Sequence, residues 1–443
     1  MKKVCLFMSC CILTSMMLIS CGGGSEKASG GGSGAVTMKE ITLPEGPVTI
    51  NMMGGAHLIT TTQAALKKYM ADHPNVTINF EKYSYAEYPV KMRLQLSNGD
   101  AVPDVVLVHD IFIPQFVKSG WLLDLTDMIP MDQVLPTMDN ASAGGRIYGL
   151  PNQASTVFAF MYRGDVYDQL GLEPPETWDE YFEQALKLKD AGYYAGAMDP
   201  ANPNDYFLWY MGMLGGSLFD RQGKVSLYKA EEALEMLKKA YDAGVFLKSG
   251  QTSTEGDYWT VFNEGKIAAF PGMSYEASRY LTNMDPKSPA YGNLRLAPAM
   301  RFSQDGPLNF SVDTTFFSVN KNSKNLEAAL HLVQYLTLSE EGCLAFANVD
   351  GEGINATYTT AYIPGIRKVV EQGTTPWPQF GGQRVISDVA KILLDTLPSI
   401  PYKDARSPEA EDIAKRIVGD MFVNGKMTPA ETVAKLRTEL ERL

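Results

Sequence analysis

The chain has 443 residues, enough for two or three domains of ~150 residues each, and its 45% hydrophobic and 20% charged residues are typical of a globular protein with sizeable cores. Its 51 acidic and 39 basic residues give a formal net charge of −12 without any stretch rich in Lys and Arg, which argues against nucleic-acid binding through a basic face. The four histidines, His57, His73, His109 and His331, lack metal-ligand spacing, so we expect neither a metal site nor a cofactor.

The N-terminus has the pattern of a secretory signal. Lys2 and Lys3 precede an apolar run at 4–19, which is shorter than the ~18 to 20 residues of a membrane-spanning helix, and no later apolar run is as long. We therefore expect residues 1–20 to be a signal peptide and the remaining chain to be soluble.

The sequence Leu18-Ile19-Ser20-Cys21 resembles a bacterial lipobox. The resemblance implies cleavage after Ser20 and a lipid on Cys21, which would anchor the protein on the extracytoplasmic side of the bacterial cell membrane. Ordinary secretion with an incidental cysteine is the alternative. Residues 21–44 begin with a Gly/Ser-rich stretch and predict a flexible tether. The remaining cysteine of the mature chain, Cys343, has apolar neighbours that favour core packing, so no disulfide framework is expected.

The body begins with alternating strands and helices. β-Branched and apolar residues predict strands at 48–53, 76–83 and 105–108, and apolar spacing predicts helices at 65–70 and 88–97. The third strand is apolar throughout, which is typical of a parallel strand covered on both faces. Strand, helix, strand, helix and strand within ~65 residues indicate a doubly wound α/β sheet.

Further elements follow along the chain. A strand is predicted at 157–162, and helices are predicted at 177–192, 231–243, 325–337 and 428–443. Two of these helices begin with a capping box, formed by Thr177 with Glu180 and by Thr428 with Glu431. Gly244 is placed to end the helix that precedes it.

A series of motifs runs in a fixed order along the body. They are the strand with Gly54-Gly55 at 48–55, then Ala65–Tyr69, Gly99–Val106, Gly120–Leu125, Ile147–Pro151, Met161–Asp165, Pro175–Glu180, Phe262–Phe270 and Lys324–Ala345. In this order, behind a lipobox, they resemble the substrate-binding lipoproteins of ABC importers, extracellular solute-binding family 1, in its maltodextrin-binding group. The resemblance covers residues ~45–443, nearly the whole body.

The resemblance implies an α/β, two-lobed fold of the periplasmic-binding-protein type II, with a ligand cleft between lobes that about three crossovers join. It places one lobe at 45–153 plus 272–320 and the other at 154–271 plus 321–443. Ligands of open α/β sheets bind beyond the carboxyl ends of strands, so loops after strands should line the cleft. Closure of the lobes would then bury the ligand of a monomeric receptor and present it to the permease.

Sugar recognition needs aromatic faces for the C–H face of a pyranose and planar polar groups for its hydroxyls. Polar residues that follow strands or lie on the first crossover match positions where the resemblance implies ligand contacts: His57, Asp110, Gln153 and Ser155. The alternatives are a solvent-facing loop for His57, an N-cap for Asp110 and turn chemistry for Gln153 and Ser155.

The densest aromatic cluster lies at 204–210, where the resemblance implies stacking platforms. Tyr206, Trp209 and Tyr210 are spaced i, i+3, i+4, so a buried helix start is the alternative. We expect at least one of these rings to stack on the ligand. Truncation of such a ring is expected to weaken binding while sparing the fold.

The sequence departs from the family pattern at one of the tryptophans that stack on sugar in the family. Where the family usually has Gly-x-Trp, this chain has Ser274, followed by Tyr275, and both are candidate ligand contacts. Trp377 lies where another family tryptophan is found, and Arg384 offers a bidentate donor to hydroxyls or a carboxylate. A packed tryptophan with a surface arginine is the alternative. Asp313, on a crossing loop, is a further candidate contact.

The favoured function is a non-enzymatic, extracytoplasmic receptor that binds a carbohydrate, foremost an oligosaccharide, and delivers it to an ABC permease. A receptor for a sugar phosphate, polyamine or metal chelate is the first alternative, although a phosphate ligand would favour several convergent cations and the sequence offers mainly Arg384. A secreted glycosidase with paired carboxylates is the second alternative, and no catalytic motif supports it.

Overall fold

The computed structural model describes residues 41–55, 59–84, 87–98, 103–131, 134, 141–151, 156–249, 256–312, 314–347 and 376–443. The predicted signal peptide, Cys21 and most of the predicted tether lie outside the described residues.

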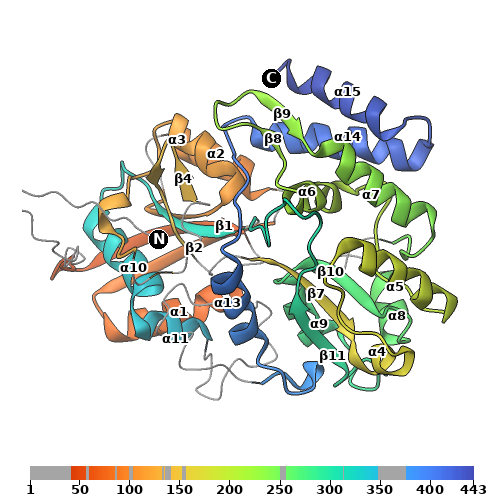
Figure 1. The fold of residues 1–443 in the computed structure, drawn as a ribbon. Coiled ribbons are helices and arrows are strands. Elements are labelled where there is room, and N and C mark those ends of the chain that lie inside the picture. Colours follow the sequence, from red (N-terminus) through yellow and green to blue (C-terminus); the bar gives the residue numbers. More distant parts are fainter. Residues whose placement is uncertain are drawn as a thin grey trace, which may run out of the picture. The chain divides into compact units, whose positions relative to one another are not determined.

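The N-terminal part forms the predicted βαβαβ unit (Figure 1). Strand β1 (Val48–Gly55) pairs in parallel with β2 (Val76–Tyr83) on one side and with β3 (Val105–His109) on the other. Helices α1 (Ile59–Asp72) and α2 (Tyr88–Asn98) connect the strands. Every residue of β3 is buried, which explains its continuous apolar sequence. The predicted parallel sheet is therefore confirmed.

Two strands from later in the chain complete this sheet in the antiparallel sense. Strand β12 (Thr315–Val319) pairs with β3, and β6 (Leu150–Pro151) pairs with β12, so the order is β2-β1-β3-β12-β6. Helices α10 (Leu326–Leu338) and α11 (Glu340–Ala347) pack against one another and against α1. Residues of α10 and of the five strands share one core, which we call the N-terminal core. Cys343 of α11 is buried, as predicted.

Strand β7 (Phe158–Arg163) is the centre of a second sheet. Strands β10 (Ala269–Met273) and β11 (Leu294–Pro298) pair with its two edges, both antiparallel. Successive side chains of a strand point to opposite faces, so β7 contributes to two cores. Phe158 and Phe160 belong to one, here the Phe160 core, and Ala159 and Met161 belong to the other, here the Met161 core.

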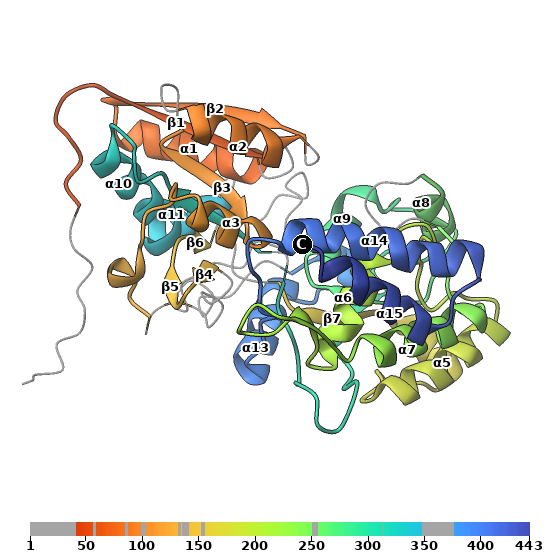
Figure 2. The same cartoon turned by 90° about the horizontal axis from the view of Figure 1, so that it is seen from above.

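Helices cover both faces of this sheet. Helix α5 (Trp178–Asp190) begins at the predicted Thr177 capping box, and α15 (Pro429–Leu440) begins at the predicted Thr428 capping box. Helices α14 (Ser407–Asn424) and α15 lie side by side (Figures 1 and 2). The other described elements are η2 (Asp110–Phe112), α3 (Ile113–Lys118), η3 (Thr126–Met128), β4 (Ser142–Ala143), β5 (Arg146–Ile147), α4 (Gly164–Leu170), α6 (Asn204–Met213), β8 (Ser217–Phe219), β9 (Val225–Tyr228), α7 (Ala230–Asp242), α8 (Gly256–Asn263), α9 (Glu276–Asn283), η5 (Pro378–Phe380) and α13 (Val385–Thr396).

The packing differs from the expected lobes in two stretches. The resemblance places 272–320 in the N-terminal lobe, but β11 and the end of β10 pair with β7; Leu294 and Leu296 lie in the Met161 core and Met273 lies in the Phe160 core. It places everything after residue 320 in the C-terminal lobe, but α10 belongs to the N-terminal core. The pattern of apolar residues predicts an element, and long-range strand pairing decides which sheet that element joins.

Two described connections between the N-terminal core and the second sheet are hydrogen-bonded to each other. The first is described at residues 156–157, before β7, and the second at residues 309–312 and 314, before β12. Asn309 accepts from the N–H of Phe158 at 3.1 Å and donates to its carbonyl at 2.9 Å. The hydroxyl of Thr156 donates to the carbonyl of Val312. Ser399, between α13 and α14, donates its N–H to the carbonyl of Asn309 at 2.9 Å.

Within the part of the chain that the structure describes, no helix has both the length and the apolar character that crossing a membrane requires.

Replacing Asn309 tests how much these bonds stabilise the fold. Asn309 is 0% exposed and makes three side-chain bonds to the backbone of Phe158 and Phe310. Asn309→Ala leaves buried backbone groups without these partners, so we expect the free energy of unfolding to fall by about 2–4 kcal/mol. Chemical denaturation measures this loss. The exposed Asn322 provides the control, because Asn322→Ala should change stability by less than ~0.5 kcal/mol. Equal losses in both variants would contradict the prediction.

Candidate functional site

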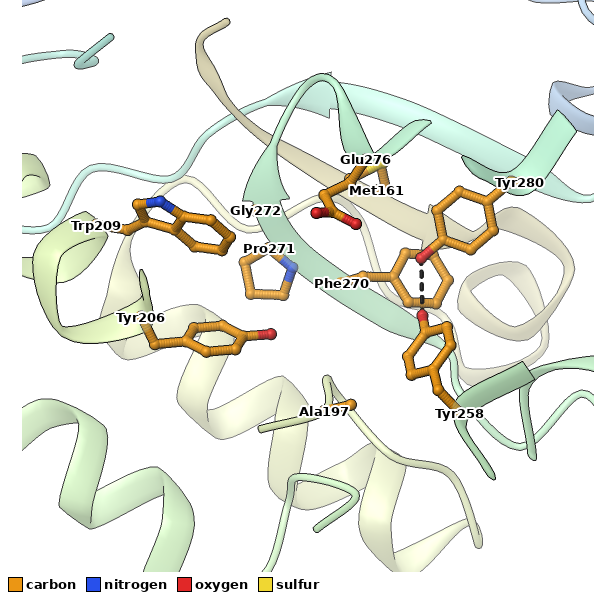
Figure 3. Close-up of a pocket in the computed structure, with 10 residues that line it drawn as sticks. All are labelled: Met161, Ala197, Tyr206, Trp209, Tyr258, Phe270, Pro271, Gly272, Glu276 and Tyr280. Carbon is orange, nitrogen blue, oxygen red and sulfur yellow. Dashed lines mark hydrogen bonds between the residues drawn. The ribbon is translucent and has the colours of Figure 1, made fainter. Parts of the chain in front are cut away.

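A narrow pocket lies where the Phe160 core and the Met161 core meet (Figure 3). The strands contribute Phe270, Pro271 and Gly272 from the middle of β10 and Met161 of β7, which pairs with Phe270. The lining residues of the pocket are Met161, Ala197, Tyr206, Trp209, Tyr258, Phe270, Pro271, Gly272, Glu276 and Tyr280.

Helix α6 provides one aromatic wall of the pocket. Tyr206 and Trp209 are three residues apart and therefore neighbours on the helix surface, with ring centroids 5.3 Å apart at an interplanar angle of 61°. They are 6% and 3% exposed. Tyr210, the third predicted stacking residue, is not among the lining residues and packs in the core against Phe302, with ring centroids 4.9 Å apart. This burial argues against the expectation that truncating these rings spares the fold.

Helices α8 and α9 provide the opposite wall. Tyr258 and Tyr280 face each other there, and their hydroxyls are hydrogen-bonded at 2.8 Å (Figure 3). Burial raises the pKa of Tyr206, Tyr258 and Tyr280 well above the ordinary tyrosine value. All three side chains therefore keep their O–H proton, and with it their donor capacity, at physiological pH.

Glu276, in the first turn of α9, brings a carboxylate between the two aromatic walls (Figure 3). The residue is 4% exposed, and its Oε1 accepts from Nη1 of Arg279 at 2.7 Å. The guanidinium of Arg279 also lies over the ring of Tyr275, 5.1 Å from its centroid. An ionised carboxylate has about four acceptor positions, so Glu276 can bind Arg279 and a ligand donor together.

Gly272 keeps space between the ring of Trp209 and the carboxylate. A Cβ atom at this position would lie 3.6 Å from Cζ3 of Trp209 and 3.9 Å from Cγ of Glu276. Both distances are ordinary van der Waals contacts, so the backbone does not require glycine here. The absence of a side chain instead leaves room about the size of a methyl group in the pocket.

Ser274 and Tyr275, at the departure from the family pattern, lie beside the pocket and not in its lining. Ser274 is buried and bonds the first connection: its N–H donates to the carbonyl of Val157 at 2.8 Å, and its hydroxyl accepts from the N–H of Val157 at 3.2 Å. Tyr275 is half-buried. Ser274 thus ties the end of β10 to the chain that enters β7.

Trp377 and Arg384 are also absent from the pocket lining. Trp377 is 2% exposed and packs in the Met161 core, where its ring centroid lies 5.7 Å from that of Phe380. Arg384 is exposed and immediately precedes α13. These surroundings favour the alternative of a packed tryptophan and a surface arginine.

Asp110 follows β3, as predicted, but its carboxylate is bound by protein groups. The residue is 1% exposed; Oδ1 lies 3.1 Å from Nδ1 of His109, and Oδ2 lies 2.5 Å from Nζ of Lys403. The N–H of Thr314 donates to Oδ2 at 3.4 Å. Burial by itself would raise the pKa of Asp110, but Lys403 and His109 outweigh burial and hold it below its ordinary value. The N-cap of η2 is His109, not Asp110.

The remaining predicted ligand contacts lie outside the described residues: His57, Gln153, Ser155 and Asp313. Sequence reasoning missed Tyr258, Glu276 and Tyr280. The tyrosines lie on short helices and have the spacing of ordinary core positions. Glu276 is two residues from Ser274, so the departure from the family pattern is the signal that could have found it.

Comparison with known sequences gives a consistent result. The profile of the bacterial extracellular solute-binding protein family matches residues 55–342. An uncharacterized ABC transporter extracellular-binding protein of Pyrococcus horikoshii is 29% identical over 146 residues, which cover 32% of this chain and 34% of that protein. The arabinooligosaccharide-binding protein of Bacillus subtilis is 26% identical over 290 residues, which cover 62% of this chain and 66% of that protein. The chain therefore matches less than two thirds of the length of these relatives.

Comparison with solved structures shows the fold. Maltose-bound MalE3 of T. maritima superposes with a TM-score of 0.69 at 21% identity, and the match covers 89% of this chain and 99% of that one. The α/β, two-lobed fold expected from the sequence is thereby confirmed.

The Asp110–Lys403 pair predicts a pH-dependent loss of stability. Lys403→Met leaves a buried carboxylate without its cation, so we expect the free energy of unfolding at pH 7 to fall by about 3–5 kcal/mol. The folded-state pKa of Asp110 is lowered, so its ionisation stabilises the wild type above the unfolded-state pKa, and this contribution is lost as pH falls toward the folded value. In the variant the pKa should rise, because only His109 and the N–H of Thr314 are then left to oppose burial. The difference in free energy of unfolding between wild type and Lys403→Met should therefore become smaller as the pH falls from 7 toward ~4.

Denaturation curves at both pH values measure this difference. Lys403→Arg keeps the positive charge and should retain most of the stability. The double variant Asp110→Asn with Lys403→Met should recover much of the loss, because it removes both charges. Equal stability of Lys403→Met and wild type at pH 7 would show that the pair contributes nothing.

Proposed function

This chain belongs to the bacterial extracellular solute-binding protein family, and on that premise we propose that it binds a carbohydrate, foremost an oligosaccharide, without turning it over. The arabinooligosaccharide-binding relative and the maltose-bound structural neighbour support a sugar ligand. The observation that carries the proposal is the pocket in which two aromatic walls flank the carboxylate of Glu276.

The pocket has the two chemistries that a sugar requires. A pyranose presents C–H groups on its faces, and the rings of Tyr206 and Trp209 offer apolar surface to such a face. It also presents hydroxyl donors around its rim, and Glu276 offers acceptor positions beside those rings. The hydroxyl of Tyr206 adds a polar group that stays protonated at physiological pH. We infer that one sugar unit of the ligand docks at this pocket.

The pocket lining also bears on two alternative functions, a receptor for a sugar phosphate and a glycosidase. Glu276 is the charged member of the ten lining residues, so its negative charge disfavours a sugar phosphate. A glycosidase of the usual kind needs two carboxyl groups within ~5–10 Å flanking the bond that is cleaved, and the lining contributes one. These features support a neutral sugar and a receptor over an anionic solute and an enzyme.

We further propose how the receptor works in the cell. The lobes would follow the cores, with 45–151 and 314–347 in one lobe and 156–312 and 376–443 in the other. Closure about the hydrogen-bonded connections would bury the sugar, and a membrane ABC permease would recognise the closed monomer. A lipid on Cys21 would keep the receptor at the extracytoplasmic face of the membrane.

A thermal-shift screen against neutral and charged oligosaccharides tests the binding proposal. A ligand at 100 times its Kd should stabilise the protein by ~2.7 kcal/mol and so raise Tm. For the sugar with the largest shift, Trp209→Ala and Tyr206→Ala should weaken affinity roughly tenfold to a hundredfold, because each removes apolar contact with the sugar. Calorimetry below the Tm of each variant measures these losses.

Tyr210→Ala is the matched control, since Tyr210 lies on the same helix with its ring in the core. It should lower Tm and leave the affinity of the folded protein close to that of wild type. No Tm shift with any saccharide, or the appearance of cleavage products on chromatography, would contradict the proposal.

The lipid anchor has its own test. Cys21→Ala removes the sulfur that the lipid would be attached to, so the variant should fail to label with a fatty-acid probe in bacterial cells. It should also leave the membrane fraction or accumulate as the uncleaved precursor. A Cys343→Ala variant controls for the loss of a cysteine and should label as wild type does. Labelling of Cys21→Ala would refute the anchor.

A further inference from the structure

We propose that the pocket receives a methyl group of the bound sugar, either the acetamido methyl of an N-acetylhexosamine or the C6 methyl of a 6-deoxyhexose. The inference rests on the proposed carbohydrate function and narrows its ligand class. Four observations carry it: the apolar lining, the tyrosine pair, the placement of Glu276 and the space at Gly272.

Apart from Glu276, the lining between the aromatic walls is apolar. Met161, Ala197, Phe270 and Pro271 contribute carbon and sulfur atoms there (Figure 3). A sugar hydroxyl placed against these side chains would give up its hydrogen bonds to water without finding equivalent partners. A methyl group in the same place gains from leaving water and needs no hydrogen-bond partner.

The hydrogen-bonded pair of Tyr258 and Tyr280 also favours a methyl group over a hydroxyl. The hydroxyls of Tyr258 and Tyr280 are bonded to each other at 2.8 Å, and both residues are almost completely buried. A ligand hydroxyl at this wall would compete with that bond, whereas a methyl group leaves it intact. The aromatic carbon of both rings remains available for van der Waals contact.

Glu276 fits the polar group that accompanies such a methyl. Its carboxylate lies between the two aromatic walls, in the same pocket that the apolar side chains line (Figure 3). An acetamido group carries its N–H donor and its methyl on the same edge of one small plane, so it can meet Glu276 and the adjoining apolar lining together. In a 6-deoxyhexose, a neighbouring ring hydroxyl would take the role of the N–H donor.

Gly272 supplies space on the scale of one methyl group. A Cβ atom there would contact Trp209 at 3.6 Å and Glu276 at 3.9 Å, so it would occupy the gap between ring and carboxylate. Gly272→Ala therefore fills part of the pocket beside Trp209 and Glu276 by ordinary contacts and is compatible with folding. Gly46→Ala is the matched control, because Gly46 is exposed and a Cβ there would meet nothing within 4 Å.

Calorimetric titration of the full-length mature protein with two matched pairs of disaccharides tests the proposal. The first pair is N,N′-diacetylchitobiose and cellobiose, and the second is an L-fucose-terminated disaccharide and its L-galactose-terminated counterpart. In at least one pair the methyl-bearing sugar should bind ~10- to 200-fold more tightly, the range that one well-fitted methylene gives in an apolar pocket. The pair that shows the preference identifies the source of the methyl group.

The variants tie that preference to the pocket. Gly272→Ala should reduce the ratio of the two affinities to near one, whereas Gly46→Ala should keep the wild-type ratio. Glu276→Gln should lower the affinity for the methyl-bearing sugar below that of wild type, since it replaces an ionised acceptor by a neutral amide. Melting temperatures of all variants show that each is folded.

The outcomes separate this proposal from the one on which it rests. Equal or weaker binding of the methyl-bearing sugar in both pairs overturns the methyl assignment and leaves carbohydrate binding standing. A preference that survives Gly272→Ala overturns the assignment to this pocket. Binding of none of the four disaccharides, together with no response to the oligosaccharide panel, refutes both proposals.

Discussion

The buried carboxylate of Asp110 constrains the architecture around it. A charge that is 1% exposed requires a cation and hydrogen-bond donors close by, and Lys403, His109 and Thr314 provide them. These groups come from the end of β3, from the connection that leads into β12 and from the segment between α13 and α14. Three distant parts of the chain must therefore meet at one point for the charge to be tolerated. The N-terminal core and the second sheet are joined there.

The second sheet explains why a pocket forms where it does. Strand β7 contributes to a different core on each of its faces, and residues of both cores line the pocket beside β10. Rings that pack in one core, such as Trp209, therefore face rings that pack in the other, such as Tyr258. A helix that carries a carboxylate begins just after β10. Apolar surface and a buried charge are thereby held on regular elements, which position side chains more firmly than long loops do.

Local pattern predicted the local structure well. The parallel unit of β1, β2 and β3 followed from alternating strand and helix patterns, and Thr177 and Thr428 cap helices as their sequences predict. Partners far apart in the chain were beyond such reasoning. No pattern near Asp110 points to Lys403, and no spacing separates the pocket residue Tyr258 from an ordinary core tyrosine. The same reason explains why β11 and α10 pack in other cores than the resemblance implies, since long-range pairing decides which sheet an element joins.

The position of β12 determines when all five strands of the N-terminal sheet can pair during synthesis. This strand lies between β3 and β6, although residues 105–109 of β3 pair with residues 315–319, synthesised much later. Bringing such distant segments together is slow, because a long loop must be ordered before the pairing contributes. We expect the first half of a nascent chain to stay without its completed sheet until Val319 has been made. For a protein bound for export, this delay would keep the chain in a form that can still be threaded through a translocation channel.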